Sequence, residues 1–229
     1  MNQPALARLT GRKRPVTDDV PPAPIGPSVS HSARVWNYWL GGTDNYPVDR
    51  ETGDRVAAVY PDIVLLARAA RGFLARAVGY LAGEAGIRQF LDIGSGLPAA
   101  SNTHQLAQAV APESRVVYVD NDPVVLAHAR ALLASAPEGV TDYVDADLRD
   151  PGKILAEAAR TLDLAEPVAL TLIAILHHVS DYDEIAGLLD GLELIKPGVV
   201  STTRWRPDGT GPAGPPAEVD QFCAVARTP

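Results

Sequence analysis

Three carboxylates and one glycine turn are the residues of this chain best suited to hold a small molecule. Asp92 stands two residues before Gly94, and Gly96 follows, so a carboxylate and two glycines share one short turn. Glycines let a ligand approach the backbone closely, and the helix after such a turn attracts negative charge. Asp120 lies where a carboxylate can accept both hydroxyls of a ribose, and Asp147 can accept from an adenine amine. We therefore expect a cofactor that contains adenosine.

Two cofactors fit this arrangement. The residues from Gly94 to Ala99 satisfy the G-x-G-x-x-G/A pattern, and Asp120 follows at roughly the 20-residue spacing of dinucleotide sites, so a nicotinamide cofactor is one interpretation. Asp92 argues the other way, because a pyrophosphate would be repelled by its charge whereas an ammonium group would be attracted. S-adenosylmethionine (SAM) carries such an ammonium group, so Asp92 favours SAM.

The elements that must position these residues follow an α/β pattern. Short apolar runs alternate with helical stretches, which is typical of parallel βαβ units with helices on both faces of a sheet. The sequence predicts strands over 89–93, 115–120, 143–144 and 168–176, with helices over 99–110, 123–133 and 154–160 between them. Pro98 is expected in the first turn of the helix after the glycine turn. Ligands of such sheets bind beyond the carboxyl ends of the strands, where the glycine turn lies.

Three further helices are expected before the sheet. A short one over 33–40 is ended by Gly41-Gly42, and Pro47 opens a second that continues to Val59. The third, over 66–81, has apolar residues at spacings of three and four and arginines on its other faces. It is therefore amphipathic and should pack on the sheet.

Composition places the chain among ordinary globular proteins, with 229 residues, 46% of them hydrophobic and 21% charged. The net charge of −8 disfavours a nucleic acid or a membrane surface as partner and suits a small-molecule substrate. The single cysteine, Cys223, excludes an intramolecular disulfide and a multi-cysteine metal site, and no metal is expected. Residues 1–30 are rich in proline, so a flexible head is expected. Without a signal peptide or a membrane-length apolar run, the cytoplasm is the expected compartment.

Three segments resemble one protein family. Residues 32–50 read SARVWNYWLGGTDNYPVDR, residues 86–98 read GIRQFLDIGSGLP, and residues 116–123 read VVYVDNDP. Together they resemble the actinobacterial DUF574 family of SAM-dependent methyltransferase-like proteins, of the class I, Rossmann-like fold. The resemblance implies a doubly wound, mostly parallel sheet, with an N-terminal helical cap over 31–84 and a SAM-binding unit over 85–229.

The resemblance also assigns cofactor roles to matching positions. Gly94, Ser95 and Gly96 would line the methionine part of SAM, with Asp92 near its amino group. The other implied contacts are Asp120 at the ribose, Asp147 with Leu148 at the adenine, Asn121 as a further cofactor-binding residue, and Gly42 and Asn45 from the cap. A solvated loop carboxylate is the alternative interpretation of Asp147.

Two residues are candidates for a direct part in catalysis. His177 follows a buried strand, and because histidine titrates near neutrality it suits a general base that deprotonates the acceptor. A structural histidine is the alternative. Tyr38 lies on the cap helix with Trp36 and Trp39, a cluster that suits either core packing or an aromatic face towards a ligand.

The chain departs from this family after Asp181. Family members continue with a helix, a fifth strand and a long helical excursion, whereas only residues 182–189 intervene here. Strands over 193–195, 199–203 and 222–226 would then either close up against the fourth strand or belong to an internally shortened chain. Three functions remain: a SAM-dependent methyltransferase acting on a small molecule, a SAM-binding protein without catalytic activity, and a nicotinamide-dependent oxidoreductase.

Overall fold

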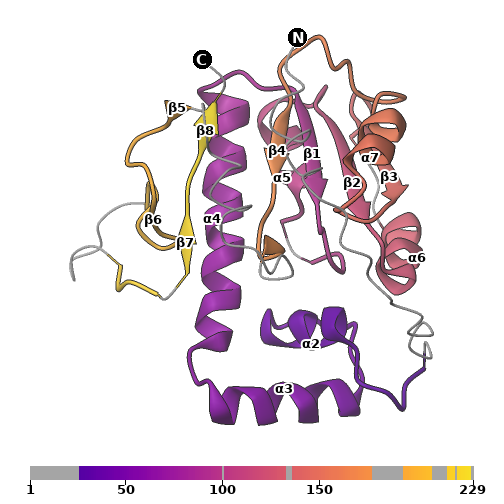
Figure 1. The fold of residues 1–229 in the computed structure, drawn as a ribbon, viewed down its shortest axis with the longest axis vertical. Coiled ribbons are helices and arrows are strands. Elements are labelled where there is room, and N and C mark those ends of the chain that lie inside the picture. The colour runs from indigo at the N-terminus through magenta and orange to yellow at the C-terminus, as the bar shows by residue number, and fades with distance from the viewer. Residues whose placement is uncertain are drawn as a thin grey trace.

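The centre of the molecule is a sheet of four parallel strands. The computed structural model describes residues 26–99, 101–132, 136–176, 193–207, 216–219 and 221–227 (Figure 1). Its strands are β1 (Gln89–Ile93), β2 (Arg115–Asp120), β3 (Val140–Asp145) and β4 (Ala169–Thr171). They lie in the order β3-β2-β1-β4, with every pairing parallel. This confirms the α/β fold, and β1 is the strand at which the order reverses, where ligands bind in such sheets.

Both faces of the sheet are covered, because alternate residues of each strand point to opposite sides. On one face, Phe90 and Val116 pack with buried residues of α4 (Ile63–Gly83) and α5 (Thr103–Val110). On the other, Leu91 and Val117 pack against α7 (Pro151–Ala158). The fourth flanking helix, α6 (Pro123–Leu132), follows β2 and contacts β3.

Two cap helices lie beyond the carboxyl ends of the strands. These are α2 (Ser32–Trp39) and α3 (Pro47–Val59), both at the end to which the strand arrows point (Figure 1). Ala33 packs there against Leu97, which follows the glycine turn, and against Val124 at the start of α6. Trp39 is buried against Val35 and Ala67, in accord with core packing. The cap is therefore fixed to the loops that follow β1 and β2.

The last described residues form two short antiparallel ladders beside α4 (Figure 1). Strand β5 (Glu193–Leu194) pairs with β8 (Ala226–Arg227), and β6 (Val200–Ser201) pairs with β7 (Phe222–Cys223). The predicted late strands exist, but they are shorter than expected. Within the described part of the chain they pair with one another and do not extend the parallel sheet.

Several predicted boundaries were wrong. The helix after the glycine turn begins at Thr103, since Asn102 is its N-cap, so Pro98 lies in the preceding loop and not in the first turn. The helix predicted from residue 154 already begins at Pro151, after Asp150 caps it. The fourth strand ends at Thr171, and the chain turns soon afterwards, where Ala174 has a φ of 55°.

Two expectations fall on residues outside those described. They are the proline-rich head up to residue 25, and the segment 177–192, which contains His177 and the stretch where a fifth strand was expected to be absent.

Candidate functional site

The glycine turn follows β1 at the switch point of the sheet. Gly94 and Gly96 both have positive φ, 75° and 65°, which favours glycine. A side chain on Gly94 would also collide with Ile175, whose Cβ lies 2.8 Å from the position of an added Cβ. Nothing lies within 4 Å of the equivalent position on Gly96. Gly94 is therefore needed for packing, whereas the space beside the Cα of Gly96 is open to a ligand.

Asp120 lies beside this turn, as its position at the end of β2 predicts. The Gly96 N–H donates to Asp120 Oδ2 at 3.0 Å, and the Asp122 N–H donates to Asp120 Oδ1 at 3.0 Å. Burial raises the pKa of Asp120 above its ordinary value, although these N–H groups oppose the shift. The carboxylate is thus fixed at the rim of the turn, with lone pairs left for ribose hydroxyls.

Asp92 is buried below the turn, between β4 and α5. Thr103 Oγ1 donates to one of its carboxylate oxygens at 2.5 Å, and Thr171 Oγ1 donates to the other at 2.7 Å. Burial raises the pKa of Asp92, and the two hydroxyl groups and the charge of Arg71 oppose that shift. Asp92 therefore holds three elements together and places negative charge under the glycine turn without pointing directly out of it.

The N-terminus of α5 differs from that of a dinucleotide site. In such sites the first helical N–H groups bind a pyrophosphate. Here the His104 N–H donates to Tyr118 Oη at 2.9 Å, and Asn102 and Gln105 form a capping box, with the Asn102 N–H donating to Gln105 Oε1 at 2.9 Å. Residues 97–102 also separate the glycine turn from the helix. With the helix end occupied and Asp92 beneath the turn, this geometry argues against a bound pyrophosphate.

Asp147 and Leu148, the residues expected at the adenine, lie on the loop after β3, and Asn121 of the loop after β2 lies beside Asp147. Asn121 Nδ2 is 3.4 Å from Asp147 Oδ2, and Arg149 pairs with both Asp147 oxygens at 2.6 and 2.9 Å. The Arg149 hydrogen bond is the main cause of a lowered pKa at Asp147. Leu148 packs at the edge of the core below them. Asp147 is therefore an anchored carboxylate in a loop that a ligand can reach.

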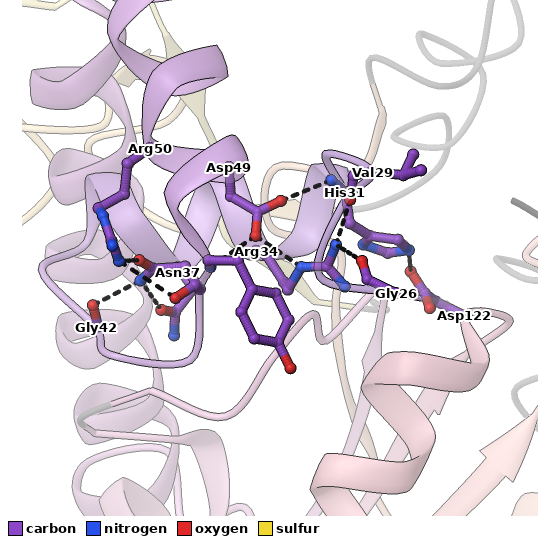
Figure 2. Close-up of polar contacts among 11 residues, drawn as sticks. Gly26, Val29, His31, Arg34, Asn37, Gly42, Asp49, Arg50 and Asp122 are labelled. Atoms are coloured by element: carbon purple, nitrogen blue, oxygen red, sulfur yellow. Dashed lines mark hydrogen bonds and ion pairs between the residues drawn. The ribbon is translucent and has the colours of Figure 1, made fainter. Parts of the chain in front are cut away.

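The cap residues named by the resemblance are engaged mostly within the cap (Figure 2). Asn45 Nδ2 donates to Asn37 Oδ1 at 2.9 Å and to the Gly42 carbonyl at 2.8 Å, while Arg50 donates to Asn45 Oδ1 at 2.9 Å. A side chain on Gly42 would collide with the Asn37 amide. Gly42 and Asn45 thus shape the link between α2 and α3.

Tyr38 faces α3. Its hydroxyl donates to Asp54 Oδ1 at 2.9 Å, and this contact raises the pKa of Tyr38. A raised pKa keeps the phenol protonated, so Tyr38 is a poor proton acceptor near neutrality. The other catalytic candidate, His177, lies outside the described residues.

Sequence reasoning missed a buried ion pair and a bridge to the cofactor loop (Figure 2). Arg34 Nε donates to Asp49 Oδ2 at 2.8 Å, and Asp49 is completely buried. His31 Nε2 lies 3.1 Å from Asp122 Oδ2, so the start of α2 contacts the residue that donates to Asp120. Asp122 precedes Pro123 and caps α6 by accepting from the Val124 N–H. An aspartate followed by a proline is a common start of a helix, so the sequence could have predicted this cap.

Two negative findings apply to the described residues. They contain no group of three His, Cys, Asp or Glu side chains placed to hold a metal ion. None of their helices combines the length and apolar character needed to cross a membrane.

Comparisons with known proteins agree with this geometry. A family model described as S-adenosyl methyltransferase matches residues 18–189 and 182–229. A DUF574 family protein from Streptomyces avermitilis has 41% sequence identity and a TM-score of 0.78, over 87% of this chain and 98% of that one. A candidate methyltransferase from Thermobifida fusca has 34% identity and a TM-score of 0.76, over 90% and 98%. Among curated proteins there is no significant match. The chain therefore belongs to the S-adenosyl methyltransferase family, whose members are SAM-dependent methyltransferases.

Proposed function

We propose that this chain transfers a methyl group from SAM to a small-molecule acceptor, with the cofactor held at the glycine turn after β1. The observation that carries this proposal is the position of Asp120. Its carboxylate lies at hydrogen-bonding distance from Gly96 at the switch point, where nothing lies within 4 Å of the added Cβ position. This is the place for a ribose whose adjoining group runs along the glycine backbone.

The residues present fit SAM better than a dinucleotide. Asp92 supplies negative charge below the turn for an ammonium group, while the occupied N-terminus of α5 offers little to a pyrophosphate. Asp120 and Asn121 would hold the ribose, and Asp147 and Leu148 would flank the adenine. The family and the geometry of the loops support these contacts.

The protein's contribution to the reaction would be binding and orientation. Bound SAM supplies an electrophilic methyl group on a positively charged sulfur. The glycine turn and Asp120 fix the cofactor, and the cap covers the carboxyl ends of the strands, so an acceptor held beneath it is brought into line. If the acceptor must lose a proton, His177 is the proposed general base.

A second candidate is a SAM-binding protein without transferase activity. It is favoured by the late strands, which form separate two-residue ladders and do not extend the parallel sheet within the described residues. The acceptor side of the fold would then be reduced while the cofactor side is kept.

The experiment that tests the proposed function is a thermal-shift titration with SAM, its demethylated product S-adenosylhomocysteine, and NAD. We expect stabilisation by the first two and none by NAD, because ligands that bind the folded state raise its melting temperature. Stabilisation by NAD alone, or by none of the three, would contradict the proposal. Release of S-adenosylhomocysteine in the presence of candidate acceptors then separates the methyltransferase from the inactive binding protein.

A further inference from the structure

Ile175 lies on the glycine turn from the side of β4. Its Cγ1, Cβ and Cδ1 atoms lie 2.6, 2.8 and 2.8 Å from the position that a Cβ on Gly94 would take. The side chain therefore rests on the backbone of the turn, in space that is open only because residue 94 is a glycine. Ile175 is itself half-buried, so part of its surface is accessible.

The backbone before Ile175 shows how this side chain reaches the turn. Strand β4 ends at Thr171, and two residues later Ile173 packs with buried side chains of α4. Ala174 then has a φ of 55°, a strained value for a residue other than glycine, and residues strained in this way cluster at binding sites. After this change of direction, Ile175 lies on Gly94.

The glycine turn is thus bounded on two sides. Towards β2, Asp120 accepts from the Gly96 N–H at 3.0 Å, and towards β4, Ile175 covers Gly94. The strand order is β3-β2-β1-β4. A ligand with its adenine at the end of β3 and its ribose at the end of β2 therefore has its remaining part over β1, next to β4. In SAM that part begins with the sulfonium centre and its methyl group, and Ile175 is an apolar, branched side chain on that side.

We propose that Ile175 contacts the alkyl group on the sulfonium and limits its size to a methyl group, so that the site rejects adenosyl compounds with longer S-alkyl chains. An apolar side chain suits a methyl group, and in a close-packed site even one added methylene is costly. Gly94 takes part indirectly, because a side chain there would displace Ile175. This inference rests on the proposed function, since it assigns a specificity-determining residue to the same cofactor site.

The test compares SAM with S-adenosylethionine, in which an ethyl group replaces the methyl group, by calorimetric titration of wild type and Ile175→Ala. One methylene more or less in an apolar pocket changes discrimination by roughly 10- to 200-fold. We expect wild type to bind SAM more tightly than the ethyl analogue by a factor in that range. We expect Ile175→Ala to bind the two ligands with similar affinity, because the shortened side chain leaves room for the ethyl group. The matched control is Ile173→Ala, the same change in a side chain that packs against α4, which should keep the preference for SAM.

The outcomes separate the two proposals. If Ile175 only packs against the turn, Ile175→Ala weakens the binding of both ligands equally, and the inference is overturned while the proposed function stands. Equal binding of both ligands by wild type overturns it as well. Should Ile175→Ala fail to fold, Ile175→Val removes a single methyl group, and a reduced preference for SAM supports the inference whereas an unchanged one overturns it. If wild type binds neither ligand, the proposed function fails first and this inference fails with it.

Discussion

The region before residue 176 and the ladders after residue 193 are built by different means. In the first, four strands keep one parallel register, both faces are covered, and polar side chains at the strand ends are hydrogen-bonded to each other. In the second, each ladder pairs only two residues per strand. Buried polar atoms without a hydrogen-bond partner occur in both regions: Ser114 Oγ and Tyr143 Oη in the first, and Thr202 Oγ1, Trp205 Nε1 and Gln221 Oε1 in the second.

We infer from this difference that the first region binds the cofactor and that the second region contributes packing. The candidate cofactor residues that the structure describes all lie before residue 176, on loops that the sheet and the cap fix. The later region is joined to the rest mainly through α4, where Trp205 is buried against Phe73 and Tyr80. Arg76 of the same helix donates to the Trp205 carbonyl at 2.8 Å. We therefore expect the late region to contribute stability without contributing to cofactor affinity.

The largest expected effect is that of Trp205→Ala. The side chain is fully buried between aromatic rings of α4, so its removal should lower the free energy of unfolding by about 3–5 kcal/mol. Urea unfolding measures the loss, and Phe222→Ala, at a residue 70% exposed in the same region, should cost far less. SAM affinity of the folded variant should be unchanged. A large loss of affinity would break the separation between the two regions.

Asp49→Asn should have the next largest effect, and it should affect both properties. Asp49 accepts from Arg34, from the His31 N–H and from the Tyr46 N–H, so the variant leaves a buried guanidinium without its counter-charge. We expect a loss of about 3 kcal/mol in unfolding free energy, together with weaker SAM binding because the cap rests on the cofactor loops. Glu51→Gln, an exposed carboxylate on the same helix, is the control. Unchanged SAM affinity in a destabilised Asp49→Asn would show that the cap is not part of the site.

Asp92→Asn should not lower the free energy of unfolding near neutrality, in contrast to Trp205→Ala and Asp49→Asn. Burial raises the folded-state pKa of Asp92, so the folded chain retains a proton that the unfolded chain has released. The free energy of unfolding therefore falls as pH rises from the ordinary aspartate pKa through the raised one, and the loss is complete above it. Asp120 titrates with the same sign, so the variant should reduce this fall and not abolish it.

The variant should thus be at least as stable as wild type near neutrality, since threonine hydroxyls can accept from an amide as well as donate. It should bind SAM about tenfold more weakly, because the ammonium group loses its counter-charge. Unfolding curves across the acid range and a SAM titration measure the two effects. A marked loss of stability near neutrality would show that Asp92 is mainly structural.

His31→Gln should have the smallest effect. The His31–Asp122 contact joins the cap to the loop of Asp120, but both side chains are partly exposed, so the cost should be about 1 kcal/mol or less. Cofactor affinity should fall by a factor of a few, measured by titration beside the exposed control Glu51→Gln. A loss of unfolding free energy as large as that of Asp49→Asn would show that His31 makes the main contact of the cap.

The sequence predicted the parallel sheet, the cap helices and the position of Asp120, because each depends on a local signal such as an apolar run, a proline at a helix start or a glycine turn. The partners of Asp92 could not be predicted in this way, since Thr171 is 79 residues away and the pairing depends on strand order. Asn102 was missed although its capping box with Gln105 is a local signal. The late ladders could not be placed, because two-residue strands carry too little pattern to fix their partners.

The most direct test of the account is the SAM affinity of Asp120→Asn, measured by calorimetry beside Asp145→Asn. Asp145 pairs with Asp120 in the register of β2 and β3 and is exposed, so it is a matched control one strand away. Loss of a charged acceptor for the ribose hydroxyls should weaken SAM binding by about tenfold or more in Asp120→Asn, and Asp145→Asn should bind as wild type does. Equal affinities in both variants would contradict a cofactor site at the glycine turn.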